Sequence, residues 1–327
     1  MKKILITGIT GQDGIFLTSL LKKNYLDCEI IGISRNKNNK DFLKNLNFLG
    51  CKNMENIKFL KLDLLNFNEV NNTIRDFHPD FVYNLSGPSS VYDSIKNPFF
   101  ENEIKIIFKN LTEALLKNNN LCNFFQASSS EMFGKQENTT LNESSEFFPN
   151  SPYAKGKLNN HLLVKDYHEK YNWKIFSGIM FNHESIFRSN HYLIMKIIEN
   201  VIDISKNKKN KLTIGSLTYE RDWSYAGDVV DAIYNIANNG KSYTYVIGSG
   251  KSYTIKNILE IIFFRFNLNW EKFTEVNTQI LRKGDPEKVT SNPKKIKLDL
   301  NWSVKKPFEE TIFEIIDFKL NQKSFDD

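Results

Sequence analysis

The chain has 327 residues, of which 40% are hydrophobic and 25% charged, so its composition is that of a folded globular protein rather than a disordered one. Its apolar runs are shorter than the roughly 18 residues of a membrane helix, and the run after Met1 is too short for a secretory leader, so we expect a cytoplasmic protein. The net charge of +6 comes with lysines that alternate with asparagines, and the three cysteines lack metal-ligand spacing, so we expect no nucleic-acid partner and no metal.

Six short apolar segments have the features of buried strands. They are continuous, rich in β-branched or aromatic residues, and closed by Gly, Asp, Asn or Ser. They cover residues 3–7, 29–33, 57–62, 81–85, 123–128 and 174–180. Amphipathic helical patterns lie between them, most clearly at 98–117 and 153–171. Strands that alternate with helices predict right-handed βαβ units, and hence a Rossmann-like α/β fold with a doubly wound parallel sheet.

The pattern changes after Met180. Residues 182–222 are expected to be irregular and polar around one helix, and 225–248 to form a further helix and strand. Helices are expected at residues 191–205, 253–266 and 307–320. We therefore expect a dinucleotide-binding domain and a smaller C-terminal α/β lobe that binds the substrate. The first would comprise residues 1–181 with 225–248, and the second residues 182–224 and 249–327.

The first expected strand runs directly into a glycine motif, G-x-x-G-x-x-G, at residues 8–14. Gly8 can make the tight turn, Gly11 lets the backbone approach a pyrophosphate, and Gly14 allows a helix to pack closely on the strand. The free N–H groups at the start of that helix attract phosphate. Glycines in a turn can be purely structural, but at the start of a βαβ series they indicate dinucleotide binding. The expected contacts are Gly8, Thr10, Gly11, Gln12, Asp13 and Gly14.

The ends of the next strands bear on which dinucleotide binds. An acidic residue after the second strand would favour NAD, whereas Ser34 and Arg35 can hold a 2′-phosphate, so we expect NADP and keep NAD as the alternative. Arg35 could also be an ordinary solvated loop residue. Asp63 is placed either to meet the adenine or to cap a helix. Leu64 and Leu85 complete the expected cofactor contacts.

A tyrosine and a lysine follow the fifth strand on an expected helix. Ser151 and Pro152 are typical of a helix start, and Tyr153 and Lys157 then share one helical face. A nearby ammonium favours the phenolate, so we expect a lowered pKa for Tyr153 and a role as general base. Y-x-x-x-K is common by chance. Here, however, the fifth strand ends in the polar run at 127–134, at the sheet edge where ligands bind.

These motifs together resemble the extended short-chain dehydrogenase/reductase superfamily. Finer details resemble the GDP-mannose 4,6-dehydratase family: ITGITGQDG at the start, PDFVYNLSGPSSV (79–91), QASSSEMFG (126–134), FPNSPYAKGK (148–157), GIMFNHES (178–185) and RDWSYAGDVV (221–230). The resemblance covers nearly the whole chain. The general superfamily motifs alone would not separate a dehydratase from an epimerase.

The resemblance implies a hydro-lyase that converts GDP-mannose to GDP-4-keto-6-deoxymannose. It implies that Ser129 binds the sugar O4 and that Tyr153 takes the O4 proton while the C4 hydride passes to the nicotinamide. Lys157 would tune Tyr153 and hold the nicotinamide ribose. Glu131 would remove the C5 proton and assist loss of the C6 hydroxyl as water, after which hydride returns to C6.

The resemblance also implies substrate contacts and subunit association. Arg221 and Arg282 would bind the diphosphate, since arginine forks suit paired phosphate oxygens; the alternative for each is a surface ion pair. Further substrate contacts are expected from Ser89, Asn182, Glu184 and Arg188. Family members associate, so a homodimer or homotetramer is expected.

The sequence departs from the family in three places. Residues 186–189 are IFRS where the family usually has PRRG, Ser90 stands at a common histidine position, and the chain is shorter near 270–290. Three other functions stay open: a 4,6-dehydratase of another sugar such as a GDP-heptose, a nucleotide-sugar epimerase or 4-reductase, and a nucleotide-binding protein without turnover. Glu131 argues against the second, because an epimerase needs no acid or base at C5 and C6.

Overall fold

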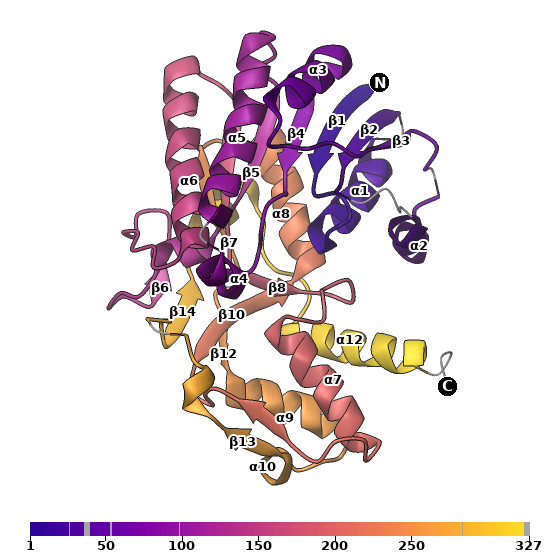
Figure 1. Ribbon diagram of the computed structural model, residues 1–327, viewed down its shortest axis with the longest axis vertical. Coiled ribbons are helices and arrows are strands. Elements are labelled where there is room, and N and C mark those ends of the chain that lie inside the picture. The colour runs from indigo at the N-terminus through magenta and orange to yellow at the C-terminus, as the bar shows by residue number, and fades with distance from the viewer. Residues whose placement is uncertain (26, 36–39, 53, 98, 283, 324–327) are drawn as a thin grey trace.

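The structure, a computed structural model, describes residues 1–25, 27–35, 40–52, 54–97, 99–282 and 284–323 (Figure 1). Seven parallel strands form the main sheet in the order β11-β7-β5-β4-β1-β2-β3. These strands are β1 (Lys2–Thr7), β2 (Cys28–Ile33), β3 (Ile57–Leu60), β4 (Phe81–Asn84), β5 (Asn123–Ser129), β7 (Ile175–Met180) and β11 (Thr244–Ile247). The order reverses between β1 and β4, which is the switch point where doubly wound sheets bind nucleotides. The predicted fold class is confirmed.

Helices cover both faces of the main sheet (Figure 1). One face packs on α1 (Gln12–Asn24), α2 (Lys40–Phe48) and α8 (Ala226–Asn239). The other packs on α3 (Phe67–Phe77), α5 (Phe99–Lys117) and α6 (Pro152–Tyr171). Along β1, Ile4 and Ile6 enter the first core and Leu5 the second, and all three are almost fully buried. Burial on both faces explains why the strands are continuously apolar.

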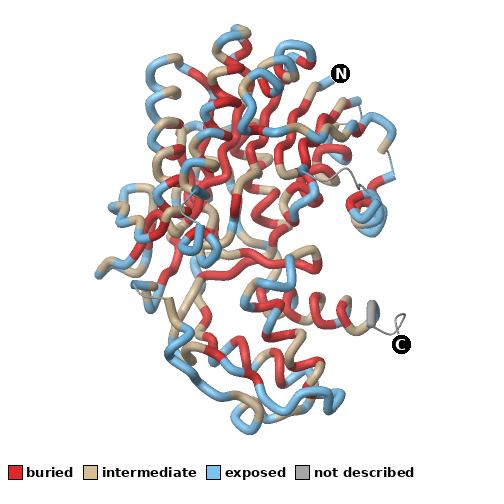
Figure 2. The backbone as a smooth tube through the Cα atoms, in the orientation of Figure 1, coloured by how far each residue is buried: buried red, intermediate tan, exposed pale blue. Residues whose placement is uncertain are grey.

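The rest of the chain builds two smaller sheets and a separate core below the main sheet in Figure 1. One sheet contains β6 (Thr140–Leu141), β8 (Asn182–Glu184), β10 (Glu220–Tyr225), β12 (Ser252–Thr254) and β14 (Lys288–Ser291). The other pairs β9 (Leu212–Ile214) with β13 (Thr274–Val276). The helices here are α7 (Leu193–Ser205), α9 (Ile255–Arg265), α10 (Trp270–Phe273) and α12 (Phe308–Lys323). Helix α11 (Lys294–Leu300) instead packs on the core of the main sheet, against β11 and α8. Figure 2 shows that buried backbone continues into this part of the molecule.

The expectation that residues 182–222 are irregular around one helix was wrong, because this stretch contributes β8, β9 and the first half of β10. Three-residue strands are too short to show a period, and β10 (ERDWSY) carries charged residues. The division into domains at residues 181 and 182 stays a proposal; β6, from the first part, pairs with β14 from the second. Within the described ranges, none of the helices is both long and apolar enough to cross a lipid bilayer.

Candidate active site

The turn between β1 and α1 is shaped for a phosphate group. Gly8 has a φ of +71°, and a Cβ there would lie 3.0 Å from the Leu85 carbonyl carbon. A Cβ on Gly14 would lie 2.3 Å from the Ile9 carbonyl oxygen, so only glycine lets α1 approach the turn this closely. Gly11 is the N-cap of α1 and supplies no side chain to its first N–H groups. Those groups are therefore available to an anion, and the residues present fit a dinucleotide.

A cavity of about 1050 Å³ opens in front of this turn. All ten residues predicted to contact only the cofactor line it: Gly8, Thr10, Gly11, Gln12, Asp13, Gly14, Arg35, Asp63, Leu64 and Leu85. Two predicted substrate residues, Ser89 and Arg188, line the same cavity. It extends from the ends of β2 and β3 to Tyr192, which caps α7.

Arg35 and Asp63, for which the sequence left two roles open, both lie at the wall of this cavity. The Arg35 side chain is 79% exposed, and its guanidinium lies 3.7 Å from the Glu103 carboxylate. Asp63 does not cap a helix, because Asn66 is the N-cap of α3. The Asp63 carboxylate instead accepts a hydrogen bond from the Leu65 backbone N–H at 3.0 Å and faces the cavity.

The predicted catalytic residues meet where β5 ends. Ser129 closes β5, and its Oγ accepts the backbone N–H of Glu131 at 3.2 Å, which starts the 3-10 helix η1 (Ser130–Phe133). Ser151 caps α6 by accepting the Ala154 N–H at 3.1 Å, and so Tyr153 lies in the first helical turn. A side-chain hydrogen bond links Tyr153 with Ser129.

The expected lowering of the Tyr153 pKa does not occur in this structure. Burial raises the pKa of Tyr153, and the hydrogen bond with Ser129 opposes the rise while the charge of Glu131 adds to it. Lys157 lies 5.7 Å from the centre of the Tyr153 ring, but its ammonium donates to the Ala127 carbonyl at 2.8 Å. Burial lowers the pKa of Lys157 to about 8, with the charge of Asp13 acting in the opposite direction. Burial is the largest effect on both pKa values, because it disfavours the charged form of each group.

Glu131 belongs to a cluster of four charged side chains. An Arg282 nitrogen lies 3.7 Å from Glu131 and 2.8 Å from Asp285, and Arg221, on β10, lies 3.2 Å from Asp285. Burial raises the pKa of Glu131, Arg282 lowers it, and Asp285 raises it again. A carboxyl whose pKa lies above its usual range can both take and give a proton near neutral pH.

A buried chain of hydrogen bonds, which the sequence did not predict, joins the phosphate turn to Lys157. The Thr7 hydroxyl donates to Asn84, and the Asn84 amide donates to Gln126, each at 2.7 Å. The Gln126 amide donates to the Ala127 carbonyl at 2.9 Å, and Lys157 donates to that same oxygen. The sequence did contain one indication of this chain, because Thr7, Asn84 and Gln126 are polar residues in otherwise apolar strands.

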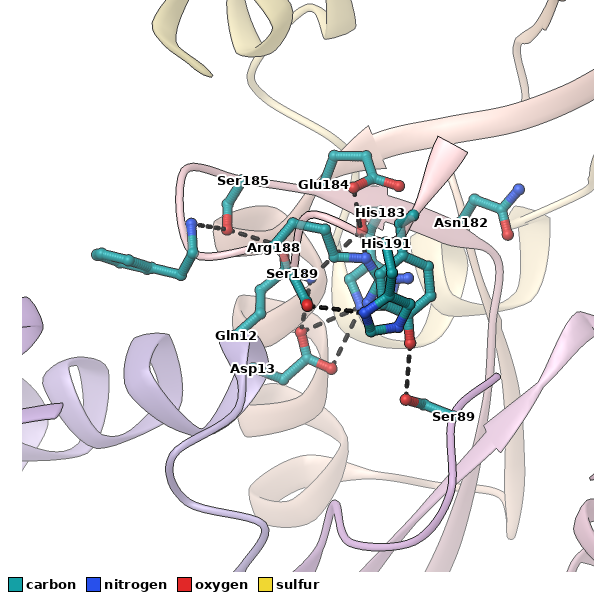
Figure 3. Close-up of polar contacts among 12 residues, drawn as sticks. Gln12, Asp13, Ser89, Asn182, His183, Glu184, Ser185, Arg188, Ser189 and His191 are labelled. Atoms are coloured by element: carbon teal, nitrogen blue, oxygen red, sulfur yellow. Dashed lines mark hydrogen bonds and ion pairs between the residues drawn. The ribbon is translucent and has the colours of Figure 1, made fainter. Parts of the chain in front are cut away.

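A second network connects the phosphate turn with β8 (Figure 3). His183 Nε2 lies 3.1 Å from a carboxylate oxygen of Asp13, and the Ser185 hydroxyl donates to the Gln12 side-chain oxygen at 2.8 Å. Asp13 raises the pKa of His183 against its burial, and His183 in return lowers the pKa of Asp13. The sequence motif contained His183, but nothing in the sequence indicated its partner.

The predicted substrate residues divide between two places. Glu184 is buried and pairs with Arg188 at 3.4 Å, and the Arg188 guanidinium lies 3.4 Å from the centre of the Tyr192 ring. The Tyr192 hydroxyl is 2.7 Å from that of Ser89, and Ser89, Arg188 and Tyr192 all line the dinucleotide cavity. Glu184 is connected to this cavity through Arg188. The Asn182 amide points away from the Asp13–His183 contact (Figure 3), and Arg221 and Arg282 lie beside Glu131.

The departures from the family pattern have local structural roles. Ser90 is the N-cap of α4 (Val91–Lys96), where its Oγ accepts the Asp93 N–H at 3.1 Å. Phe187 packs against Phe16 and Phe48, with ring centres 5.4 and 6.3 Å apart. An apolar residue at position 187 therefore fastens this loop to α1 and α2.

Fold and site together define a class of protein, the extended short-chain dehydrogenases/reductases. The chain is similar over 99% of its length to a dTDP-glucose 4,6-dehydratase from Bacillus anthracis solved with NAD (TM-score 0.83, 21% identity, 98% of that chain covered). It is as similar to a UDP-glucose 4-epimerase from Thermotoga maritima (TM-score 0.84, 20% identity, 98% of this chain and 99% of that one). At these identities the likeness concerns the fold alone.

Sequence comparison identifies the family. The model of the family described as GDP-mannose 4,6 dehydratase matches residues 5–315. GDP-mannose 4,6 dehydratase 1 of Arabidopsis thaliana is 31% identical over 97% of this chain and 89% of its own length. The chain belongs to the GDP-mannose 4,6-dehydratase family.

Proposed function

We propose that this chain is an NADP-dependent GDP-mannose 4,6-dehydratase. Family membership supports the reaction class, and one feature of the site carries the proposal: Glu131 stands directly beyond Ser129 at the end of β5, with a raised pKa. A 4-reductase or epimerase needs no acid or base at C5 and C6, whereas water elimination needs both.

The first step concerns the sugar O4. Ser129 binds O4, and Tyr153, within hydrogen-bond reach of Ser129, receives its proton. Tyr153 needs a cation close by to give up its own proton, and Lys157 supplies one from the next turn of α6. A bound nicotinamide dinucleotide would accept hydride from C4 and later return it to C6.

The second step concerns C5 and C6. Once C4 is a ketone, the C5 proton is acidic, and the Glu131 carboxylate removes it. The protonated carboxyl then donates to the departing C6 hydroxyl, which leaves as water. The proton that Glu131 takes from C5 leaves in the water. When hydride is returned to C6, C5 must gain a proton, and the proton that Tyr153 took from O4 balances this last step.

NADP is proposed over NAD on the residues that follow β2. Arg35 lines the cavity with an exposed guanidinium, and Ser34 lies beside Thr10, with their hydroxyls 3.3 Å apart. These groups suit a 2′-phosphate. An Arg35→Ala variant should lose affinity for NADP at least tenfold and keep its affinity for NAD.

For the substrate, we assign the diphosphate to Arg221 and Arg282, with Asn182 near it, and we propose a homodimer or homotetramer. Phe99, Ile106 and Leu162 are exposed apolar residues on the packed helices α5 and α6, which supports association there. Light scattering coupled to size exclusion would give the mass of the assembly directly.

The deciding experiment incubates the purified protein with GDP-mannose, other GDP-sugars and UDP-sugars, and catalytic NADP, without added reductant. The expected product of GDP-mannose has lost one water. An isomer of unchanged mass, or stoichiometric use of NADPH, would identify an epimerase or reductase instead. Glu131→Gln should abolish elimination, and Tyr153→Phe should abolish every reaction of the panel.

A further inference from the structure

A tight turn brings an acidic residue between the two arginines of the site. The Asp285 N–H donates to the Arg282 carbonyl at 3.3 Å, and Gly284 has a φ of +76°, which suits glycine. The turn is anchored because the Asn150 side-chain amide donates to the Gly284 carbonyl at 2.8 Å. Arg282 and Asp285 therefore leave the turn on the same side, toward Glu131 and β10.

Asp285 is the common partner in this group. It contacts Arg282 at 2.8 Å and Arg221 at 3.2 Å, and its side chain is only 13% exposed. The Arg282 nitrogen that pairs with Asp285 is also the one 3.7 Å from Glu131. Two carboxylates thus compete for one nitrogen, and Asp285 holds it at the shorter distance.

The charges of the four side chains cancel as the structure stands. A diphosphate placed on Arg221 and Arg282 would add negative charge beside Asp285, and like charges at such distances repel. Arg221 and Arg282 therefore cannot pair fully with both the Asp285 carboxylate and the diphosphate. Removing the Asp285 charge would also leave Arg282 with Glu131 as its nearest carboxylate.

We propose that Asp285 is a positioning residue for the diphosphate site. In the free protein it pairs with Arg221 and Arg282, and so holds Arg282 away from Glu131. When a diphosphate binds, the two arginines pair with the diphosphate in place of Asp285. The inference rests on the proposed function for its substrate, a nucleoside diphosphate sugar. It adds a role for a residue that does not line the dinucleotide cavity.

The test measures binding of inorganic pyrophosphate by calorimetry, which needs no knowledge of base or sugar. Asp285→Asn keeps the shape of the side chain and removes the competing charge, so it should bind pyrophosphate at least threefold more tightly than the original protein. Asp285→Glu keeps the charge and should bind as the original protein does. Arg221→Gln should weaken binding severalfold in either background.

A second measurement is the pH dependence of kcat/KM, which reports on the charges around Glu131. The groups that face Glu131 are Arg282 and Asp285 from the turn, Arg221 from β10 and Tyr153 from α6. In Asp285→Asn, loss of the Asp285 charge and a closer Arg282 both stabilise the ionised form of Glu131, so the acid limb of kcat/KM should move to lower pH. A general loosening of the site would weaken pyrophosphate binding, whereas the proposed role requires tighter binding together with the shifted limb.

Unchanged or weaker pyrophosphate binding by a folded Asp285→Asn protein would overturn the inference. If that variant does not fold, Asp285→Ser carries the same test. Asp317→Asn, in the exposed pair with Arg265 at 2.8 Å, is the matched control and should change neither measurement. A protein that binds pyrophosphate as predicted but dehydrates no GDP-sugar would contradict the proposed function and leave the role of Asp285 supported.

Discussion

Burial and the charge of Asp285 raise the pKa of Glu131, whereas Arg282 lowers it more than any other cation does. Glu131 must be ionised to take the C5 proton, so activity is lost as the pH falls through its pKa. Arg282→Gln removes the cation and raises that pKa, and the acid limb of kcat/KM should therefore move to higher pH. A pH profile of both proteins, from pH 5 to 9, measures the shift.

The control for this prediction is Arg265→Gln, which removes an arginine from an exposed pair on α9. It should leave the profile unchanged. An acid limb that stays in place, or moves to lower pH, in Arg282→Gln would show that another group sets it.

Lys157 gives a prediction on the alkaline side. Burial lowers its pKa to about 8, so the ammonium beside Tyr153 loses its charge within the working range of an enzyme. We expect kcat/KM to fall as the pH rises through about 8. Lys157→Arg keeps a charge at all these pH values and should flatten the fall while reducing the maximal rate. The same alkaline midpoint in both proteins would assign the limb to another group.

At the scale of elements, the contact between β1 and α1 depends on Gly14. The Cβ of an alanine would lie 2.3 Å from a backbone oxygen of Ile9, which cannot rotate away as a side chain can. We expect Gly14→Ala to lower the free energy of unfolding by about 2 kcal/mol, through overpacking, and to abolish dinucleotide binding. Urea unfolding and fluorescence titration with NADPH measure the two effects. Lys23→Ala, on an exposed site of the same helix, should change stability by less than about 0.5 kcal/mol.

Elements with strong local signals were predictable from the sequence. The main-sheet strands have runs of apolar residues, and the glycine turn and the start of α6 depend on neighbours in the sequence. The three-residue strands were not predictable, because their pairing is decided by partners far along the chain. Asp222 illustrates this: it accepts backbone N–H groups of Ser249, Gly250 and Ser291, none of which its own neighbourhood indicates.

The candidate site also has one part that the sequence predicted and another that it could not. Tyr153, Lys157, Ser129 and Glu131 could be found from their motifs and their order along the chain. Their pKa values could not, because burial in the folded molecule determines the direction for Tyr153. No local motif could predict that Asp285 lies between two arginines, because Arg221 is far from Asp285 in the sequence.

At the scale of the whole molecule, the pair of Asp13 and His183 joins residues 170 positions apart. Asp13 belongs to the phosphate turn, and His183 lies on β8, which pairs with the strand that carries Arg221. Both side chains are largely buried, with 21% and 10% of their surface exposed. The contact therefore connects the part of the site that binds the dinucleotide with the part assigned to the diphosphate.

This pair predicts how stability depends on pH. The pKa of His183 is raised above 6.5, so its contribution is complete below that pH and is lost as the pH rises through the raised value. The pKa of Asp13 is lowered below 3.8, so its contribution is complete above 3.8 and is lost only in stronger acid. The free energy of unfolding should thus decline as the pH rises above 6.5 in the original protein. In His183→Gln it should be about 2 kcal/mol lower at pH 6, because Asp13 is left partly buried without its partner, and this decline should disappear. Urea unfolding at several pH values measures both quantities, with His168→Gln as the control. An equal decline with pH in His183→Gln would mean that the pair does not hold the two parts of the site together by charge.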